Sequence, residues 1–202
     1  GRYYLGHRYS EYLDFIVNAD PLYKDYISIL NKEIKGSFGI DIKQSLYSDD
    51  FTRLFIHDEE SFLKIEFINE VSYRAGKPVP MEFGLLDIPS NILSYKLTAL
   101  VGRDEPKDIF DIIYIAMNYS FEWKEVFYDA KQKAVLNEID IEERFSNFHL
   151  KSLDLVDWMI NSPDKLFLAA QLKKVADDFL FGKSNSVGSG KSVLKEARPK
   201  IL

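Results

Sequence analysis

Strand-like stretches come first in this chain and helical stretches afterwards, and this order constrains the fold more than any other feature. Apolar and polar residues alternate over much of residues 10–86, whereas apolar residues recur at helical spacing from residue 91 onward. Segregation of strands from helices favours an α+β domain over alternating strand–helix units. The sequence therefore predicts an α+β fold, in which a mixed β-sheet with flanking helices is followed by a C-terminal helical lobe.

The first part of the chain is predicted to contain one full helix among its strands. Residues 1–8 are expected to be the end of a helix that Gly6 terminates. A strand over 10–17 follows, and Asp20-Pro21 begins a helix that runs to residue 35. Further period-2 stretches predict an antiparallel meander and one more short strand, over 40–48, 51–57, 62–69 and 80–86.

Ser90 is expected to cap the first of several helices, and the pattern beyond it is helical throughout. The predicted helices cover 91–101, 108–118, 121–135, 141–148, 150–160 and 163–181. The final stretch contains Gly190-Lys191-Ser192, but Asn185 stands where a P-loop needs its first glycine. We therefore expect an α/β core over 1–89, a helical lobe over 90–181 and a flexible tail over 182–202.

Composition excludes several kinds of site. The 202 residues carry a net charge of −6, which argues against a broad basic face for nucleic-acid phosphates and leaves room only for a local basic patch. Without cysteine there is no disulfide framework and no thiolate-ligated zinc, so any metal must be held by oxygen ligands. The chain has no apolar run of membrane-spanning length and no signal-peptide pattern, so we expect a cytoplasmic protein without a membrane partner.

Two segments carry charged residues in a recognisable order. The first is His7-Arg8-Tyr9-Ser10-Glu11-Tyr12-Leu13-Asp14-Phe15, and the second runs from Ser90 to Ile112. They resemble two motifs of the AbiEii/AbiGii abortive-infection toxins, a family of the nucleotidyltransferase superfamily. The first motif is His-Arg-x-Ser-x-Asp-Leu-Asp-Phe, and the second is a Lys-Leu-x-Ala-Leu helix ending in arginine, followed by Lys-Asp-x-x-Asp. The resemblance covers about residues 1–114 and implies a nucleotidyltransferase-like sheet.

The first segment implies a metal site that has lost a ligand. In the family, two aspartates two residues apart on a strand point the same way and hold Mg²⁺ against a nucleoside triphosphate. Asp14 matches the second aspartate, but Tyr12 replaces the first, and Glu11 should face the opposite side of the strand. A third carboxylate comes from a neighbouring strand, which Lys64-Ile65-Glu66-Phe67 resembles. The resemblance therefore implies Asp14 and Glu66 as Mg²⁺ ligands; the alternative is a solvated strand face with a Lys-Glu pair.

The second segment implies a nucleotide-binding group. Lys96 and Arg103 lie seven residues apart, on one helix face, where two cations could meet phosphates, while Asp108 and Asp111 could hold these cations in place. The alternative is a salt-bridged helical hairpin without a catalytic role. His7 is expected to bond a backbone carbonyl at a helix end. The resemblance implies the catalytic residues Asp14, Glu66, Lys96 and Asp108, and the nucleotide-binding residues Arg8, Ser10, Lys96, Arg103 and Lys107.

The implied reaction is Mg²⁺-dependent transfer of a nucleotidyl group from a nucleoside triphosphate to an RNA, such as tRNA, or to a protein. A toxin of this type would also have a cognate antitoxin. Two features favour a degenerate fold that binds nucleotide or a partner without turnover: Tyr12, and the family's Gly-Gly-Thr/Ser, which should precede His7 and is not in the given sequence. The chain is then either truncated at Gly1 or lacks the glycine pair. A third hypothesis is an interaction protein whose helical lobe binds an antitoxin-like partner.

Overall fold

The computed structural model describes residues 2–10, 12–41, 44–59 and 61–200, and the chain divides into two compact units. Ser10–Tyr73 form one, which we call the sheet unit. Gly1–Tyr9 and Arg74–Leu202 form the other, which we call the helical unit. The expected division at residue 89 differs from this one because the short hairpin before residue 89 and the first nine residues group with the helices.

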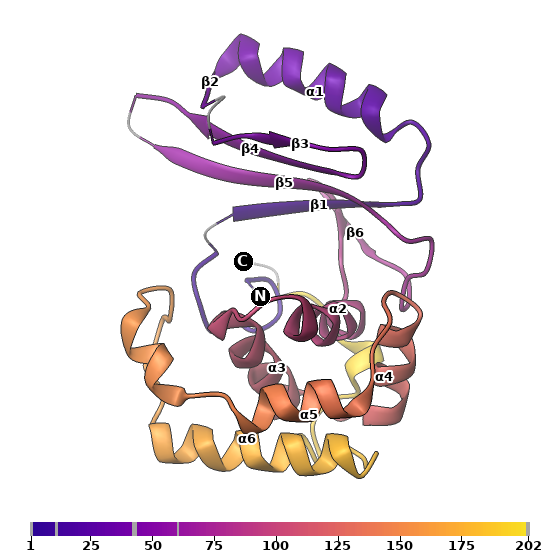
Figure 1. The fold of residues 1–202 in the computed structure, drawn as a ribbon, viewed down its shortest axis with the longest axis vertical. Helices are drawn as coiled ribbons and strands as arrows, with labels where there is room; N and C mark the ends of the chain where they lie inside the picture. The colour runs from indigo at the N-terminus through magenta and orange to yellow at the C-terminus, as the bar shows by residue number, and fades with distance from the viewer. Residues whose placement is uncertain (1, 11, 42–43, 60, 201–202) are drawn as a thin grey trace. The chain divides into compact units, whose positions relative to one another are not determined.

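The sheet unit combines a mixed sheet with one helix (Figure 1), α1 (Tyr23–Ser37). Its strands are β1 (Tyr12–Asn18), β2 (Gly39–Ile40), β3 (Leu46–Tyr47), β4 (Phe51–His57) and β5 (Phe62–Glu70). Among the described residues the order is β1-β5-β4-β2, and β3 also pairs with β4. β1 is parallel to β5, and the other pairs are antiparallel. A parallel neighbour needs a long connection, which α1 and the meander supply.

One face of this sheet is apolar and packs on α1. Period-2 alternation sends Leu54 and Ile56 of β4, and Ile65 and Phe67 of β5, to the same face. There they form a cluster with Tyr23 and Ile27, the buried residues of α1. The hydroxyl of Tyr23 also donates a hydrogen bond to the backbone oxygen of Phe67, at 2.9 Å. Side chains at the alternate positions, including Lys64 and Glu66, therefore emerge on the other face, as predicted.

The helical unit contains a small hairpin, the longer helices and two short 3₁₀ helices. The hairpin joins β6 (Val79–Met81) to β7 (Gly84–Leu86). The helices are α2 (Pro89–Gly102), α3 (Pro106–Asn118), α4 (Trp123–Lys131), α5 (Glu138–Ser146), α6 (Lys165–Leu180), η1 (Leu150–Leu155) and η2 (Leu194–Glu196). Among the described residues, none of the helices has the length and apolar content needed to cross a membrane.

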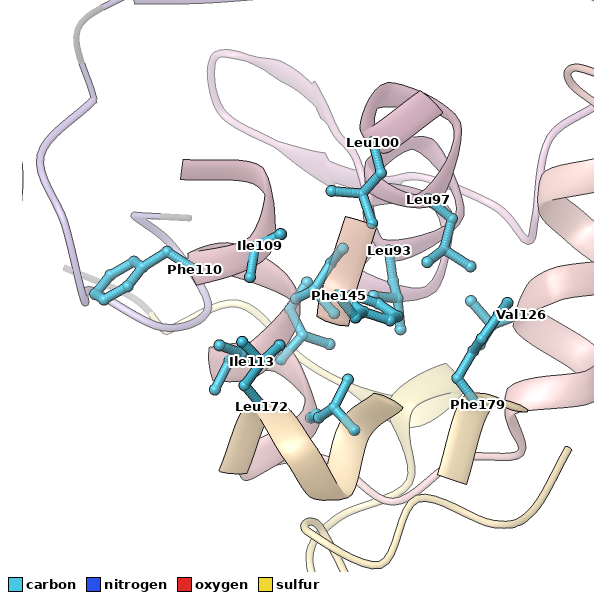
Figure 2. Packing of buried hydrophobic residues seen from close by; sticks show 14 of the residues in the cluster. Leu93, Leu97, Leu100, Ile109, Phe110, Ile113, Val126, Phe145, Leu172 and Phe179 are labelled. Carbon is cyan, nitrogen blue, oxygen red and sulfur yellow. The ribbon is translucent and has the colours of Figure 1, made fainter. Parts of the chain in front are cut away.

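Apolar side chains of α2, α3, α4, α5 and α6 meet in one core (Figure 2), to which η1 and η2 add Leu153 and Leu194. On α2, Leu93, Leu97 and Leu100 recur at spacings of four and three residues, so they share the buried face. Rings of α4 and α5 surround Phe179 of α6, with the Phe145 ring 5.9 Å away between centroids and nearly perpendicular. Burial of each such side chain contributes about 1.5–3 kcal/mol. This core fixes α2 against α3, the helices that carry Lys96 and Lys107 of the predicted nucleotide-binding set.

Five predicted features differ from the structure. Residues 2–5 form turns rather than a helix end, although Gly6 does adopt the left-handed φ of 63°. Ser90 lies inside α2, whose N-cap is Ile88. The predicted strand 40–48 is reduced to the short β2 and β3, and the stretch 80–86 forms both strands of a hairpin instead of one strand. The predicted helix 150–160 shortens to η1, after which Met159 pairs with Arg8 as an isolated bridge.

Residues 182–200, where a flexible tail was expected, pack on the helical unit. The side-chain amide of Asn185 donates to the backbone oxygens of Ala116 and Tyr119, each at 2.7 Å, and so satisfies carbonyls at the end of α3. Gly188 lies so close to the same carbonyls that an added Cβ would stand 1.9 Å from the Tyr119 oxygen. Leu194 is 2% exposed in the core. Ser, Gly and Asn suit a capping loop as well as a linker, so composition alone could not distinguish the two.

Candidate functional site

The predicted site residues divide between the two units. Ser10, Asp14 and Glu66 belong to the sheet unit, with Tyr12 at the replaced position. The rest of the predicted set belongs to the helical unit: Arg8, Lys96, Arg103, Lys107, Asp108 and Asp111. Glu11 lies outside the described residues.

Strand register brings the sheet-unit residues onto one face. In the parallel pair β1–β5, Tyr12 is opposite Lys64 and Asp14 is opposite Glu66. Residues directly opposite each other in neighbouring strands project to the same side, and period-2 alternation adds the positions two residues along. Arg53 of β4 is opposite Glu66 on the other side of β5. The face away from α1 thus collects two carboxylates, two cations and the tyrosine.

The cations of this face are engaged with Glu66 and Tyr12. Arg53 donates from Nε to Oε1 of Glu66 at 2.7 Å, and its Nη2 lies 2.7 Å from the same oxygen. The Lys64 ammonium is 3.5 Å from this oxygen and 3.7 Å from the centre of the Tyr12 ring. Lys64, Arg53, Asp14 and Glu66 together have a formal charge of zero. Ser10 is exposed and donates to the backbone oxygen of Tyr12, at 2.9 Å.

The Mg²⁺ that the resemblance implies does not fit these residues. Divalent cations of this kind take carboxylate and other oxygen ligands. In the described part of the chain, no three His, Cys, Asp or Glu side chains are grouped so that they could hold a metal ion. At the first ligand position, Tyr12 presents a ring face to Lys64, and Glu66 is already bonded to Arg53. The face holds ammonium and guanidinium groups next to its carboxylates.

In the helical unit, two predicted cations, Lys96 and Arg103, form a cluster with the buried Asp108 and Asp111. Lys96 of α2 lies 2.7 Å from Oδ1 of Asp108 and 2.7 Å from Oδ2 of Asp111, which are one turn apart on α3. Arg103, just beyond α2, donates from Nε to Oδ2 of Asp108 at 2.7 Å and from Nη2 to Oδ1 at 3.0 Å. The Asp108 side chain is fully buried, whereas that of Arg103 is 47% exposed. The predicted salt bridges between these two helices are therefore present.

The segment before β1 adds two partners that the sequence did not predict. Arg8 donates from Nε to Oδ1 of Asp111 at 2.7 Å and from Nη2 to Oδ2 at 2.9 Å. Nε2 of His7 donates to Oδ1 of Asp111 at 2.7 Å, so the expected bond to a backbone carbonyl is wrong. The His7 ring stacks on the rings of Phe110 and Tyr114, with centroids 5.5 and 4.6 Å away. Pairing with an aspartate 103 or 104 residues away leaves no local sequence signal.

Burial and charge oppose each other in this cluster. Burial alone would raise the pKa of Asp111, but hydrogen bonds from Arg8 and His7 and the charge of Lys96 hold that pKa well below the usual range. Burial would lower the pKa of Lys96, and the charges of Asp111 and Asp108 reverse this, so the pKa is raised. For Asp108, burial is outweighed by Arg103 and Lys96, and the pKa is lowered. These residues are all charged at neutral pH.

His7 behaves differently because burial prevails. Its pKa is lowered below 6.5, mainly by desolvation and only partly offset by the hydrogen bond to Asp111. A neutral His7 leaves the cluster with three cations, Arg8, Lys96 and Arg103, against Asp108 and Asp111, a net charge of +1. The exposed part of the Arg103 side chain is where an anion from solution could bind to the cluster. Lys107, in the first turn of α3, has its ammonium 3.9 Å from a carboxylate oxygen of Glu105.

Lys133 is a buried lysine of the helical unit that the sequence did not predict as part of a site. The ammonium of Lys133 lies 2.7 Å from Oδ1 of Asn91, 2.6 Å from Oγ of Ser94 and 3.3 Å from the centre of the Tyr95 ring. These neutral partners lie on α2, in the turns before Lys96. Lys133 therefore braces the helix that carries Lys96, and its place just after α4 gave no sequence signal.

Comparisons with known proteins support the fold. No protein-family model and no curated protein sequence matches the chain. Two solved structures match. JHP933 from Helicobacter pylori has 19% identity and a TM-score of 0.54, and the match covers 86% of this chain and 77% of that one. A "putative nucleotidyltransferase" from H. pylori has 20% identity and a TM-score of 0.54, and the match covers 86% of this chain and 79% of that one. The chain has a nucleotidyltransferase-like fold. At this identity the similarity extends to the α+β architecture with its mixed sheet, as predicted.

Proposed function

We propose that this chain is a catalytically impaired nucleotidyltransferase-type protein, which binds a nucleoside triphosphate without transferring its nucleotidyl group. One observation carries the proposal: on the sheet face that the resemblance assigns to metal, Tyr12 lies under the Lys64 ammonium and Glu66 is bonded to Arg53. In-line nucleotidyl transfer depends on metal ions to neutralise charge on the transferred phosphorus group. A face on which Tyr12 replaces one carboxylate and Glu66 is bonded to Arg53 does not supply these ligands.

The helical cluster supports nucleotide binding. It has a net charge of +1, and part-buried hydrogen bonds to Asp108 and Asp111 orient its cations. The cations therefore lose little conformational freedom when an anion binds. Arg103 uses Nε and Nη2 for Asp108, and nearly half of its side chain is exposed. A guanidinium is suited to phosphate oxygens through its planar set of donors. In the proposal Arg103 contacts the triphosphate, while Asp108 and Lys96 position Arg103.

The finer assignments are part of the same proposal. The segments 7–15 and 90–112 resemble motifs of the AbiEii/AbiGii toxins, and the similarity to the H. pylori structures supports a nucleotidyltransferase-like fold. A cytoplasmic toxin of this type would modify tRNA or a protein and would pair with an antitoxin. Asp14 and Glu66, still opposite each other in register, are what favours an active enzyme as the second candidate.

The test measures binding and transfer separately. The protein is incubated with Mg²⁺, tRNA or a protein extract, and each of the four ribonucleoside triphosphates labelled at the α-phosphate. Triphosphate binding is followed in parallel by calorimetry. The proposal predicts that at least one triphosphate binds and that no label is transferred. Label transfer by the unaltered chain would establish the active-enzyme candidate, and absence of any triphosphate binding would contradict the nucleotide-binding proposal.

A pair of arginine variants locates the binding residue. Arg103→Gln removes the charge next to Asp108, and we expect triphosphate affinity to fall about tenfold, as for a lost charge-assisted hydrogen bond. Arg144→Gln is the matched control in the same unit: its side chain is 39% exposed and lies 3.8 Å from Asp104. Equal losses in both variants would mean that binding follows overall charge rather than the cluster.

A further inference from the structure

Lys64 occupies a particular place on the polar face of the sheet. Its ammonium lies 3.7 Å from the centre of the Tyr12 ring on β1 and 3.5 Å from Oε1 of Glu66 on its own strand. Asp14 is the register partner of Glu66 and lies two residues beyond Tyr12. The Lys64 ammonium therefore lies within 4 Å of both the Tyr12 ring, at the position of the lost ligand, and the Glu66 carboxylate. Arg53 approaches Glu66 from β4, on the other side.

A divalent cation and this ammonium would compete for the same surroundings. A metal ion bound by Asp14 and Glu66 would lie beside a positive charge, and like charges a few ångströms apart repel strongly when partly removed from water. The Lys64 side chain is 26% exposed and that of Glu66 10%, so solvent screens this repulsion only in part. A lysine ammonium also offers donors to carboxylates and needs none of the closely spaced oxygen ligands of Mg²⁺.

We propose that Lys64 replaces the metal ion on this face, so that the loss of metal binding has two separate causes, Tyr12 and Lys64. The proposal rests on the proposed function, which assigns this face to a former metal site. It goes further in naming Lys64 as the residue that excludes a divalent cation even when the missing carboxylate is supplied. Replacement of Tyr12 by aspartate is then insufficient to create a metal site.

The experiment measures binding of Mn²⁺ alone, without nucleotide, by the loss of its free electron-paramagnetic-resonance signal. Four proteins are compared: the unaltered chain, Tyr12→Asp, Lys64→Met, and the double variant. Methionine keeps the length of the lysine stem and removes its charge. We expect no stoichiometric binding to the unaltered chain, and affinity at least about tenfold higher for the double variant than for either single variant, which corresponds to about 1.4 kcal/mol.

Lys24→Met combined with Tyr12→Asp is the matched control. Lys24 lies in the same unit and pairs with Asp49 at 2.7 Å, but both side chains are mostly exposed. This control should bind Mn²⁺ no better than Tyr12→Asp alone. Circular dichroism and melting temperature confirm folding, and Lys64→Gln replaces Lys64→Met if the latter unfolds the protein.

Three outcomes would overturn the inference: stoichiometric Mn²⁺ binding to the unaltered chain, equal affinity for Tyr12→Asp and the double variant, or no binding to a folded double variant. None of these outcomes requires nucleotidyl transfer, so they are distinct from a failure of the proposed function. Label transfer by the unaltered chain would contradict the proposed function, whereas equal Mn²⁺ affinity of Tyr12→Asp and the double variant would contradict only the role of Lys64.

Discussion

The two charged clusters of this protein use the same residue types in different ways. In the helical unit, Asp108 and Asp111 are buried and their cations converge on them from two helices and the N-terminal segment. The side chains of Arg8 and Lys96, which bind Asp111, are only 12% and 15% exposed. On the sheet face, the side chains of Arg53 and Lys64 next to Glu66 keep 38% and 26% of their surface exposed. Burial decides how much each cluster contributes to the free energy of unfolding. When one partner of a buried ion pair is removed, the other charge stays out of contact with water, whereas a part-exposed cation becomes hydrated.

The largest effect is expected for Asp111→Ala. The substitution removes the carboxylate that binds Arg8, His7 and Lys96. The Lys96 ammonium then stays nearly enclosed without this carboxylate. We expect the free energy of unfolding to fall by about 3–5 kcal/mol, the range for one partner removed from a buried pair. Urea unfolding followed by circular dichroism measures it.

Asp104→Ala is the control for this substitution, because the Asp104 side chain is 87% exposed and 3.8 Å from its partner Arg144. Its unfolding free energy should stay within about 0.5 kcal/mol of the unaltered chain. A loss for Asp111→Ala as small as that of the control would remove the distinction between the two clusters.

A smaller effect is expected for Glu66→Ala. Arg53 and Lys64 keep 38% and 26% of their side-chain surface exposed, so water can replace the carboxylate. Allowing for solvent screening, the unfolding free energy should fall by about 1 kcal/mol. Urea unfolding measures this change as well. A loss above about 3 kcal/mol would mean that the sheet cluster stabilises the fold as strongly as the helical cluster.

The smallest effect concerns His7 and pH. Its folded-state pKa lies below 6.5 because the ring is desolvated, so the unfolded chain binds the proton more readily. The neutral ring therefore makes its full contribution to the free energy of unfolding above about pH 6.5. This contribution is lost as the pH falls through the lower, folded-state pKa. Unfolding free energies measured between pH 8 and 5 should decline on the acid side.

His7→Gln should flatten part of this decline because glutamine does not titrate. His149→Gln serves as a control for a histidine outside the cluster. If the His7 variant keeps the full pH dependence of the unaltered chain, the ring is not buried in its neutral form.

Period-2 and helical patterns predicted the central elements well because they depend on local spacing. β4, β5, α1, α2 and α3 lie close to their expected positions. Elements whose state depends on distant contacts were not predictable in the same way. The segment 182–200 has the composition of a linker, and its order comes from contacts with the end of α3.

The candidate site shows the same limit. Three-residue spacing placed Asp108 and Asp111 together on α3, where both bind Lys96. Seven-residue spacing predicted Lys96 and Arg103 on one helix face, but Arg103 lies just beyond α2 in extended backbone and still reaches Asp108. The contacts of His7 and Arg8 with Asp111 are tertiary and left no trace in spacing. Period-2 alternation predicted the face of Lys64, but its approach to Tyr12 depends on the register of a parallel pair, which the sequence does not specify.

The most direct test of the account is the affinity of the unaltered chain for its preferred triphosphate, measured by calorimetry with excess EDTA and again with Mg²⁺. If Lys64 and Arg53 have replaced the metal ion, the dissociation constants measured with EDTA and with Mg²⁺ should agree within about threefold. This comparison applies after correction for the Mg²⁺ that the triphosphate itself binds. Binding that requires Mg²⁺, with an affinity gain of tenfold or more, would contradict the account.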